Sequence, residues 1–451
     1  MTFLIYIAAF LALLGVLVTI HEFGHFIFAR IFKVHVQRFS VGMGPVIYKK
    51  KDKFGTEFAL SAIPLGGYVS MITEKLLEIE PETKTQLTQD QLKNTFDSKP
   101  KWQRALIMFA GPLANFILSI FLFTGIFMST LDPHVVPVVS KVESSISEIN
   151  GSFKLNDRIK KINGVSINEA KDLNLELLRY AGFSGSINFS VEREGFDEIL
   201  NLNIDVENFL PSSESQTDPM KYLGIMLDYK MEPIIGNIVN GGSAERAGIF
   251  PNDRVLSINN NKILFSEDIR KLVQNNANKN LDFKILRNDQ ILYVPVKISS
   301  SFDDTGNSIG ILGVTFGTKR TFFQAFSKGA YETYNLSIKT LQFIGKMFTG
   351  SMGTENLSGP IGIAQMAGNT AQAGLLPFIY LMALLSISLA VINLLPIPVL
   401  DGGQLTLLGV EAIRGKPLAE KTENFIYTGG ALIVGALMIF AIFNDISRFI
   451  G

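Results

Sequence analysis

The chain has 451 residues, of which 47% are hydrophobic and only 18% are charged. This is too apolar for an ordinary soluble protein and indicates a membrane protein with a water-soluble part. The 41 basic and 41 acidic residues balance, so nothing in the charge favours a nucleic-acid partner. The absence of Cys excludes disulfides and thiol catalysis.

Four apolar segments are long enough to span a bilayer: residues 3–32, 105–128, 376–400 and 425–443. The first lacks the basic leader of a cleavable signal peptide. Basic residues dominate the start of the loop that follows it, and Arg414, Lys416 and Lys421 lie between the third and fourth segments. Because basic loops stay in the cytoplasm, both termini and the long region 130–370 are expected outside.

The first segment contains a zinc-binding pattern. Residues 2–20 carry no charge, and His21-Glu22-Phe23-Gly24-His25 follows directly. Residues four apart share one face of a helix, so His21 and His25 can bind one metal ion, with Glu22 as the general base of a peptidase. The alternative to a metal site is that these polar residues only pack against neighbouring helices. Ionisable groups inside a membrane helix usually have a function, however.

A catalytic zinc takes three protein ligands, so one more is needed. The remaining candidates are the other histidines, His35 and His134, or a carboxylate. His35 lies in the basic loop, and His134 follows the second segment. Asp401 ends the third apolar segment, and it is expected near the same membrane face as the His pair. We therefore expect Asp401 to be the third ligand rather than only a turn residue before Gly402.

Two further regions provide candidate substrate contacts. Residues 39–71 contain stretches of alternating apolar and polar residues and are rich in Gly, which predicts a β-hairpin near the site. It is either an ordinary cytoplasmic hairpin or one whose edge pairs with an extended substrate. Asn115 in the second segment can hydrogen-bond across a helix interface. The candidates are Asn115, Asn393, Pro396, Pro398, Gly66, Gly67 and Tyr68.

An internal repeat lies in the outer region. The stretch beginning Leu155-Asn-Asp157 matches the one beginning Pro251-Asn-Asp253, which indicates two small tandem domains rich in strands. The second copy, with Gly242 to Gly248 ahead of the match, resembles PDZ domains of bacterial proteases. Leu223, Gly224 and Ile225 resemble the carboxylate-binding loop that opens such a domain. The domains either bind peptide ends or act as a size filter.

Together these motifs resemble the site-2 protease family of intramembrane zinc metalloproteases, over nearly the whole chain. The resemblance rests on the HExxH motif, Gly111 to Asn115, the PDZ-like repeat and the stretch from Asn393 to Asp401. The resemblance implies a polytopic α-helical membrane protein with four transmembrane helices, a membrane-associated β-hairpin region and two tandem periplasmic PDZ domains. His21, His25 and Asp401 would bind one Zn²⁺, and Glu22 would be the catalytic base.

The family also implies substrates and a location. Members cleave single-span membrane proteins, such as an anti-sigma factor and remnant signal peptides, after an upstream site-1 type protease has cut them. The expected location is the bacterial inner membrane, with the active site toward the cytoplasm. Residues 1–129 are expected to hold the first two transmembrane helices with the HExxH motif and the β-hairpin region, and residues 371–451 the last two with the Asp-Gly zinc motif. Between them we expect a first PDZ-like domain at 130–206, a second at 220–300, and a linker with an amphipathic surface segment at 320–370. The alternative is a non-catalytic membrane adaptor that presents its PDZ domains to envelope proteins.

Overall fold

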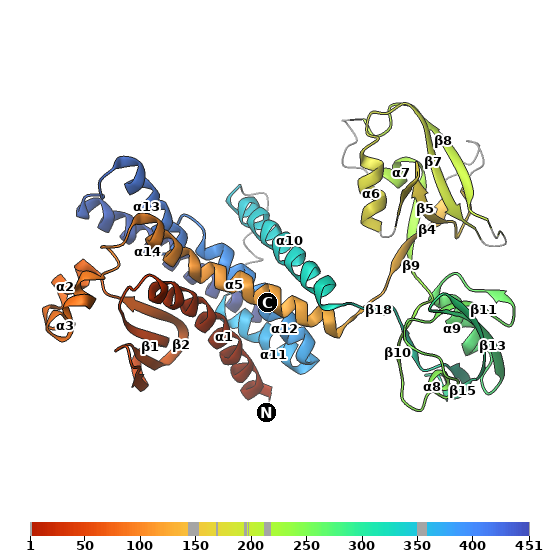
Figure 1. Cartoon of the computed structure of the whole chain (residues 1–451), viewed down its shortest axis with the longest axis horizontal. Helices are drawn as coiled ribbons and strands as arrows, with labels where there is room; N and C mark the ends of the chain where they lie inside the picture. The colour runs from red at the N-terminus through yellow and green to blue at the C-terminus, as the bar shows by residue number, and fades with distance from the viewer. Residues whose placement is uncertain are drawn as a thin grey trace. The chain divides into compact units, whose positions relative to one another are not determined.

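The computed structural model describes residues 2–142, 153–167, 170–193, 196, 198–211, 218–349 and 359–450. The chain forms two compact units (Figure 1). The helical unit comprises residues 1–128 and 321–451, and the β-rich unit comprises residues 129–320.

Four described helices are long and apolar enough to cross a membrane, as expected: α1 (Thr2–Ile31), α5 (Lys101–Ser129), α12 (Leu375–Asn393) and α14 (Glu420–Ile450). The third ends at Asn393 instead of continuing to residue 400. Pro396 and Pro398 follow, and proline cannot donate the backbone hydrogen bond that a continuing helix needs. The turn they form leads directly into α13 (Asp401–Arg414).

Apolar packing joins α1 to α11 (Pro360–Ala373) and α12. Leu13 and Leu17 of α1 share a buried cluster with Ala367 of α11 and Leu381 of α12. The amphipathic helix α10 (Phe322–Phe348) lies against α5, where Ser119 and Thr333 hydrogen-bond at 3.2 Å. Short helices α2 (Glu74–Ile79), α3 (Pro81–Gln86) and α4 (Gln89–Lys93) precede α5.

A small sheet follows α1, formed by β1 (Val36–Lys51) and β2 (Glu57–Met71), in which residues 38–41 pair with both halves of β2 and residues 46–51 pair with its first half. Its register shifts repeatedly, and Gly42 and Gly66 have φ values of 89° and 110°, which side-chain-bearing residues rarely adopt. Among the described strands, β2 pairs only with β1. Residues 57–60 of β2 pair with two different parts of β1, whereas residues 67–71 pair with residues 36–41 alone, so the other edge of residues 67–71 has no partner among the described strands.

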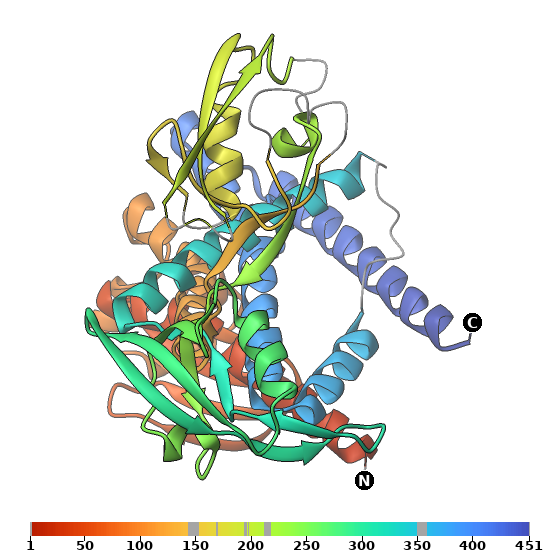
Figure 2. The same ribbon diagram turned by 90° about the vertical axis from the view of Figure 1, so that its right-hand side faces the viewer.

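The β-rich unit contains two subdomains, each with a helix beside its sheet (Figures 1 and 2). The first subdomain comprises β4 (Val135–Val142), β5 (Arg158–Ile162), β6 (Val165–Ser166), α6 (Ala170–Leu178), β7 (Gly185–Glu192), β8 (Leu200–Val206), α7 (Pro219–Tyr222) and β9 (Ile225–Met231). Its strands run in the order β8-β7-β5-β4-β9, with β6 on β5.

The second subdomain comprises β10 (Ile235–Ile238), α8 (Ser243–Arg246), β11 (Arg254–Ile258), β12 (Asn261–Lys262), α9 (Ser266–Gln274), β13 (Asn280–Arg287), β14 (Gln290–Lys297), β15 (Ser299–Phe302), β16 (Ser308–Ile311) and β17 (Val314–Phe316). Its main sheet has the order β12-β11-β13-β14. Outside both subdomains, β3 (Leu131–Asp132) pairs with β18 (Thr318–Lys319).

The expected assignment of Leu223, Gly224 and Ile225 to the second subdomain is wrong. β9 pairs with β4, and Leu223 and Ile225 are buried in the core of the first subdomain. The expected boundary at 220 therefore falls inside the first subdomain. The sequence around Leu223 showed the loop but not its pairing partner, which lies more than 80 residues earlier.

The internal repeat encodes the same buried ion pair twice. In the second subdomain both carboxylate oxygens of Asp253, which is 0% exposed, accept hydrogen bonds from Arg287 at 2.7 Å. In the first, Asp157 accepts two hydrogen bonds from Arg193 in the same way. Asn252 precedes Asp253 with φ of 72°, a conformation that Asn tolerates better than most residues. The repeated Asn-Asp therefore positions an arginine across the sheet.

We predict that Asp253→Ala lowers the stability of the β-rich unit by about 3 kcal/mol, because it removes a fully buried carboxylate and leaves the part-buried Arg287 without its counter-charge. For a unit of this size the unfolding midpoint should fall by roughly 6–12 °C in scanning calorimetry. The control is Asp282→Ala, which removes an exposed carboxylate from the same sheet. Equal midpoints for the two variants would contradict the role given to Asp253.

Candidate functional site

His21 and His25 lie one turn apart on α1 and are both buried, with 8% and 7% of their surface exposed. Their Nε2 atoms are 3.3 Å apart. The predicted shared face of the helix therefore brings the two imidazoles together. They lie in the second half of a largely apolar helix, where burying a polar side chain without a partner costs free energy.

Asp401 completes the cluster from the first turn of α13. Its Oδ2 lies 3.2 Å from Nε2 of His21 and 3.4 Å from Nε2 of His25. Burial alone would raise the pKa of Asp401, but the two histidines outweigh it and lower that pKa to about 2. The residue lies outside the four helices that are long and apolar enough to cross a membrane, and it presents a carboxylate to the histidines.

The spacing of these three atoms fits a zinc ion. With Zn–N and Zn–O distances of about 2.0–2.2 Å, the ligand atoms of a tetrahedral site are about 3.3–3.6 Å apart. The three observed separations are 3.2, 3.3 and 3.4 Å. Two imidazole nitrogens and a carboxylate oxygen are ordinary zinc donors. A three-residue set also leaves the fourth position open, as catalytic zinc sites require.

The second ring nitrogen of His25 is fixed by α5. Nδ1 of His25 lies 2.8 Å from the carbonyl oxygen of Ile107, to which it can only donate. This sets the tautomer that leaves Nε2 with its lone pair toward Asp401. A backbone carbonyl carries no side-chain signal, so the sequence could not identify this contact.

Asn115 and Asn393 approach the other histidine. The amide of Asn115 lies 3.4 Å from Nδ1 of His21, and that of Asn393 lies 3.4 Å from its Nε2. Oδ1 of Asn115 is buried and has no hydrogen-bond partner in this orientation. A half-turn of the amide places Oδ1 toward Nδ1 of His21, where it accepts a hydrogen bond from Nδ1–H and leaves the lone pair of Nε2 free.

Glu22 faces a cavity of about 1210 Å³ in the helical unit. The cavity is also lined by His21, His25 and Asp401, together with Gly66, Gly67, Tyr68 and Asn393. The backbone of β2 passes directly over Glu22, since a Cβ atom at Gly67 would lie 3.0 Å from its Cγ. The structure thus brings these predicted substrate-contact residues to the same space as the His pair.

Other predicted residues do not line this cavity. Asn115 lies behind His21, and Pro398 packs instead against Gly430 of α14. Leu223, Gly224 and Ile225 belong to the β-rich unit.

Glycines allow the elements of the site to approach closely. A Cβ atom at Gly403 would lie 2.0 Å from the carbonyl oxygen of Ile397, so the Gly pair after Asp401 lets α13 fold back on the proline turn. A Cβ atom at Gly111 would lie 2.3 Å from Nε2 of His25 and 2.8 Å from Cε1 of His21. The sequence interpretation gave Gly111 a packing role, and the structure shows that its neighbours are the two imidazoles.

Gly111→Ala should therefore displace the imidazoles and weaken zinc binding by at least about tenfold, the lower end of what outer-shell changes cost. Zinc affinity measured by competition with a chromophoric chelator tests this. The matched control is Gly125→Ala on the same helix, where an added Cβ would meet no atom within 4 Å. Equal affinities of the two variants would show that Gly111 does not position the histidines.

Comparison with known proteins places these features in a family context. The model of peptidase family M50 matches residues 9–437. The chain is 35% identical to a regulator of sigma E protease from Haemophilus influenzae, over 99% of this chain and 100% of the relative. It is 34% identical to the regulator of sigma-E protease RseP of Escherichia coli, with the same coverage. The protease RseP of Yersinia pestis is 32% identical over 98% of both chains.

Proposed function

The chain belongs to peptidase family M50, the site-2 proteases, and is a zinc metalloprotease; from this premise we propose which bonds it cuts and how. Its substrates are single-span membrane proteins, and the cut falls within their transmembrane segments. An anti-sigma factor and remnant signal peptides are the proposed clients, each after a first cut by an upstream site-1 type protease. The observation that carries this proposal is the His21–His25–Asp401 cluster at one end of an apolar, membrane-spanning helix.

His21, His25 and Asp401 hold one zinc ion in this proposal, and Glu22 is the catalytic base. When bound, zinc lowers the pKa of a coordinated water to near 7 and polarises the scissile carbonyl group. Glu22 lines the same cavity and follows His21 directly, so it takes up the proton and passes it to the leaving amine. Asn115 and the Ile107 carbonyl keep the imidazoles in the tautomer that the site needs.

The substrate lies along β2. A helical backbone hides its carbonyls, so the segment to be cut must first unwind. The free edge of β2 offers unpaired backbone groups, and Gly66, Gly67 and Tyr68 line the cavity. An extended substrate can pair with this edge as an added strand. Asn393 can bond its remaining backbone groups, and Pro396 and Pro398 shape the turn that carries Asp401.

The protein is a multi-pass membrane protein, for which we propose the bacterial inner membrane. The excess of Lys and Arg after α1 and between α12 and α14 supports a cytoplasmic location for these loops. Both termini and the β-rich unit are then periplasmic. We assign its two subdomains to the PDZ class, because both carry the repeated Asn-Asp motif on small sheets beside a helix.

Cleavage of a purified single-span substrate in detergent tests this function. We expect product with the zinc-loaded protein, none after treatment with a chelator, and recovery when zinc is restored. Cleavage that survives complete removal of metal would contradict the proposal. A protein that binds zinc tightly but cuts no single-span substrate, trimmed or untrimmed, would support the adaptor alternative.

A further inference from the structure

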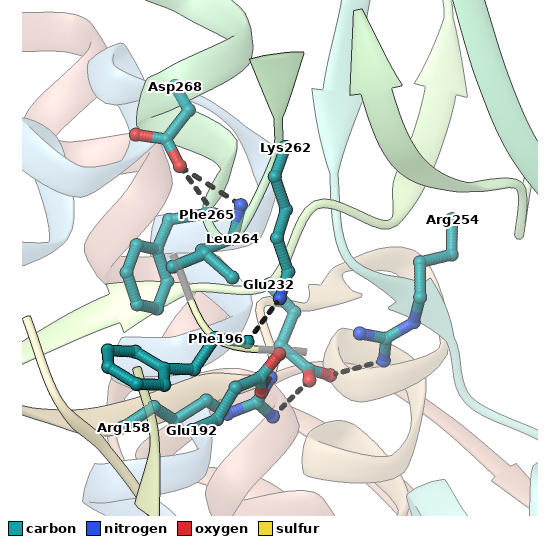
Figure 3. A network of polar contacts seen from close by, with 9 residues as sticks. All are labelled: Arg158, Glu192, Phe196, Glu232, Arg254, Lys262, Leu264, Phe265 and Asp268. Carbon is teal, nitrogen blue, oxygen red and sulfur yellow. Dashed lines mark hydrogen bonds and ion pairs between the residues drawn. The ribbon is translucent and has the colours of Figure 1, made fainter. Parts of the chain in front are cut away.

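A buried carboxylate joins the two subdomains of the β-rich unit. Glu232 lies in the short segment between β9 and β10, where the chain passes from the first subdomain to the second. Only 8% of its surface is exposed. Figure 3 shows arginines approaching it from different elements.

Each oxygen of this carboxylate binds one subdomain. Arg158 of β5 donates from Nη2 to Oε1 of Glu232. Arg254 of β11 donates from Nη2 to Oε2 at 3.0 Å. Arg158 also lies near Glu192 of β7, with 3.6 Å between Nη1 and Oε2. Burial would raise the pKa of Glu232, but the two arginines outweigh it and hold that pKa below its usual range.

Apolar and polar contacts beside Glu232 join the same two subdomains. Phe265, at the start of α9, is buried against Val136 and Val138 of β4. Asp268 accepts hydrogen bonds from the backbone of Leu264 and Phe265 and so holds this turn in place. At the edge, Lys262 donates to the carbonyl oxygen of Phe196 at 3.1 Å (Figure 3).

The two kinds of contact constrain different motions. The Phe265 contact is apolar and non-directional, so it permits rotation of one subdomain on the other. The two charge-assisted hydrogen bonds of Glu232 are directional, and turning the subdomains apart would break at least one of them and leave a part-buried charged group with one ion pair fewer. We propose that Glu232 is an orientation lock that makes the two subdomains one rigid body through Arg158 and Arg254.

The lock is a property of the β-rich unit and does not depend on the protease activity. Its consequence is that a ligand reaching both subdomains meets their surfaces at one fixed spacing. If the two subdomains moved freely relative to each other, the ligand would instead meet their surfaces over a range of spacings.

Single-molecule energy transfer in the full-length protein tests the lock. The chain has no Cys, so Ser186→Cys on β7 and Gln290→Cys on β14, both exposed, introduce one dye site in each subdomain. We expect one narrow transfer peak in the parent chain. Glu232→Gln, which keeps the side-chain shape but removes the charge, should at least double the width of the peak or shift it.

Arg254→Gln is the second variant, because this arginine is only partly buried and its loss leaves the Arg158 contact intact. It should broaden the peak as well, and it decides the outcome if Glu232→Gln does not fold. The control is Asp228→Asn, which removes an exposed charge from β9. A peak as narrow in Arg254→Gln, or in folded Glu232→Gln, as in the control would overturn the proposal.

Discussion

The Glu22→Gln variant is expected to bind zinc as the parent protein does and to lose cleavage roughly 10⁴-fold, the upper end of what a general base contributes. The amide has nearly the size of the carboxylate but cannot take up a proton. His21, His25 and Asp401 do not depend on Glu22 for their arrangement, since their polar contacts are with one another and with residues of α5 and α12.

Zinc binding and cleavage by the Glu22→Gln variant are measured separately. Zinc content by elemental analysis should remain at one ion per chain, while product formation from a single-span substrate should fall below detection. Glu74→Gln makes the same chemical change at an exposed carboxylate lining the same cavity and should leave cleavage within about twofold. Persistent cleavage by Glu22→Gln would show that another group is the base.

Asp401→Ala should lose zinc itself. Changes in the outer shell of a metal site already cost about 10–100-fold in affinity, so removal of a ligand should cost more than about 100-fold. The two histidines would remain close together without the carboxylate that lies between them at 3.2 and 3.4 Å. Cleavage should fall in parallel with occupancy.

The affinity for zinc is measured by competition with a chromophoric chelator. Glu411→Ala is the control, because it removes a carboxylate from the same helix that pairs with Lys101 and Arg104 instead of the histidines. An unchanged affinity in Asp401→Ala would exclude this residue as a ligand and return attention to His35 and His134.

The sequence predicted those site residues that the spacing of the histidines, or the small number of possible ligands, was enough to identify. The four-residue interval placed His21 and His25 on one face, and the shortage of His and Cys directed attention to Asp401, which the structure places beside them. The family and the class of enzyme are confirmed by the comparisons. The assignment of individual ligands stays a prediction until metal binding is measured.

The sequence failed where pairing over long distances decides the structure. Ile225 was assigned to the wrong subdomain, because no residue near Ile225 in the sequence indicates that its strand pairs with β4. The end of the third helix was placed too late, because an unbroken apolar run outweighed two prolines. The Ile107 carbonyl leaves no side-chain signal at all.

The position of the cut in the substrate shows whether hydrolysis takes place within a membrane-spanning segment. Mass spectrometry of the fragments released from a single-span substrate identifies the bond that the zinc-loaded protein hydrolyses. The account predicts a cut inside the apolar segment, absent with Glu22→Gln and after removal of zinc. A cut confined to the water-exposed flanks of the substrate would contradict it.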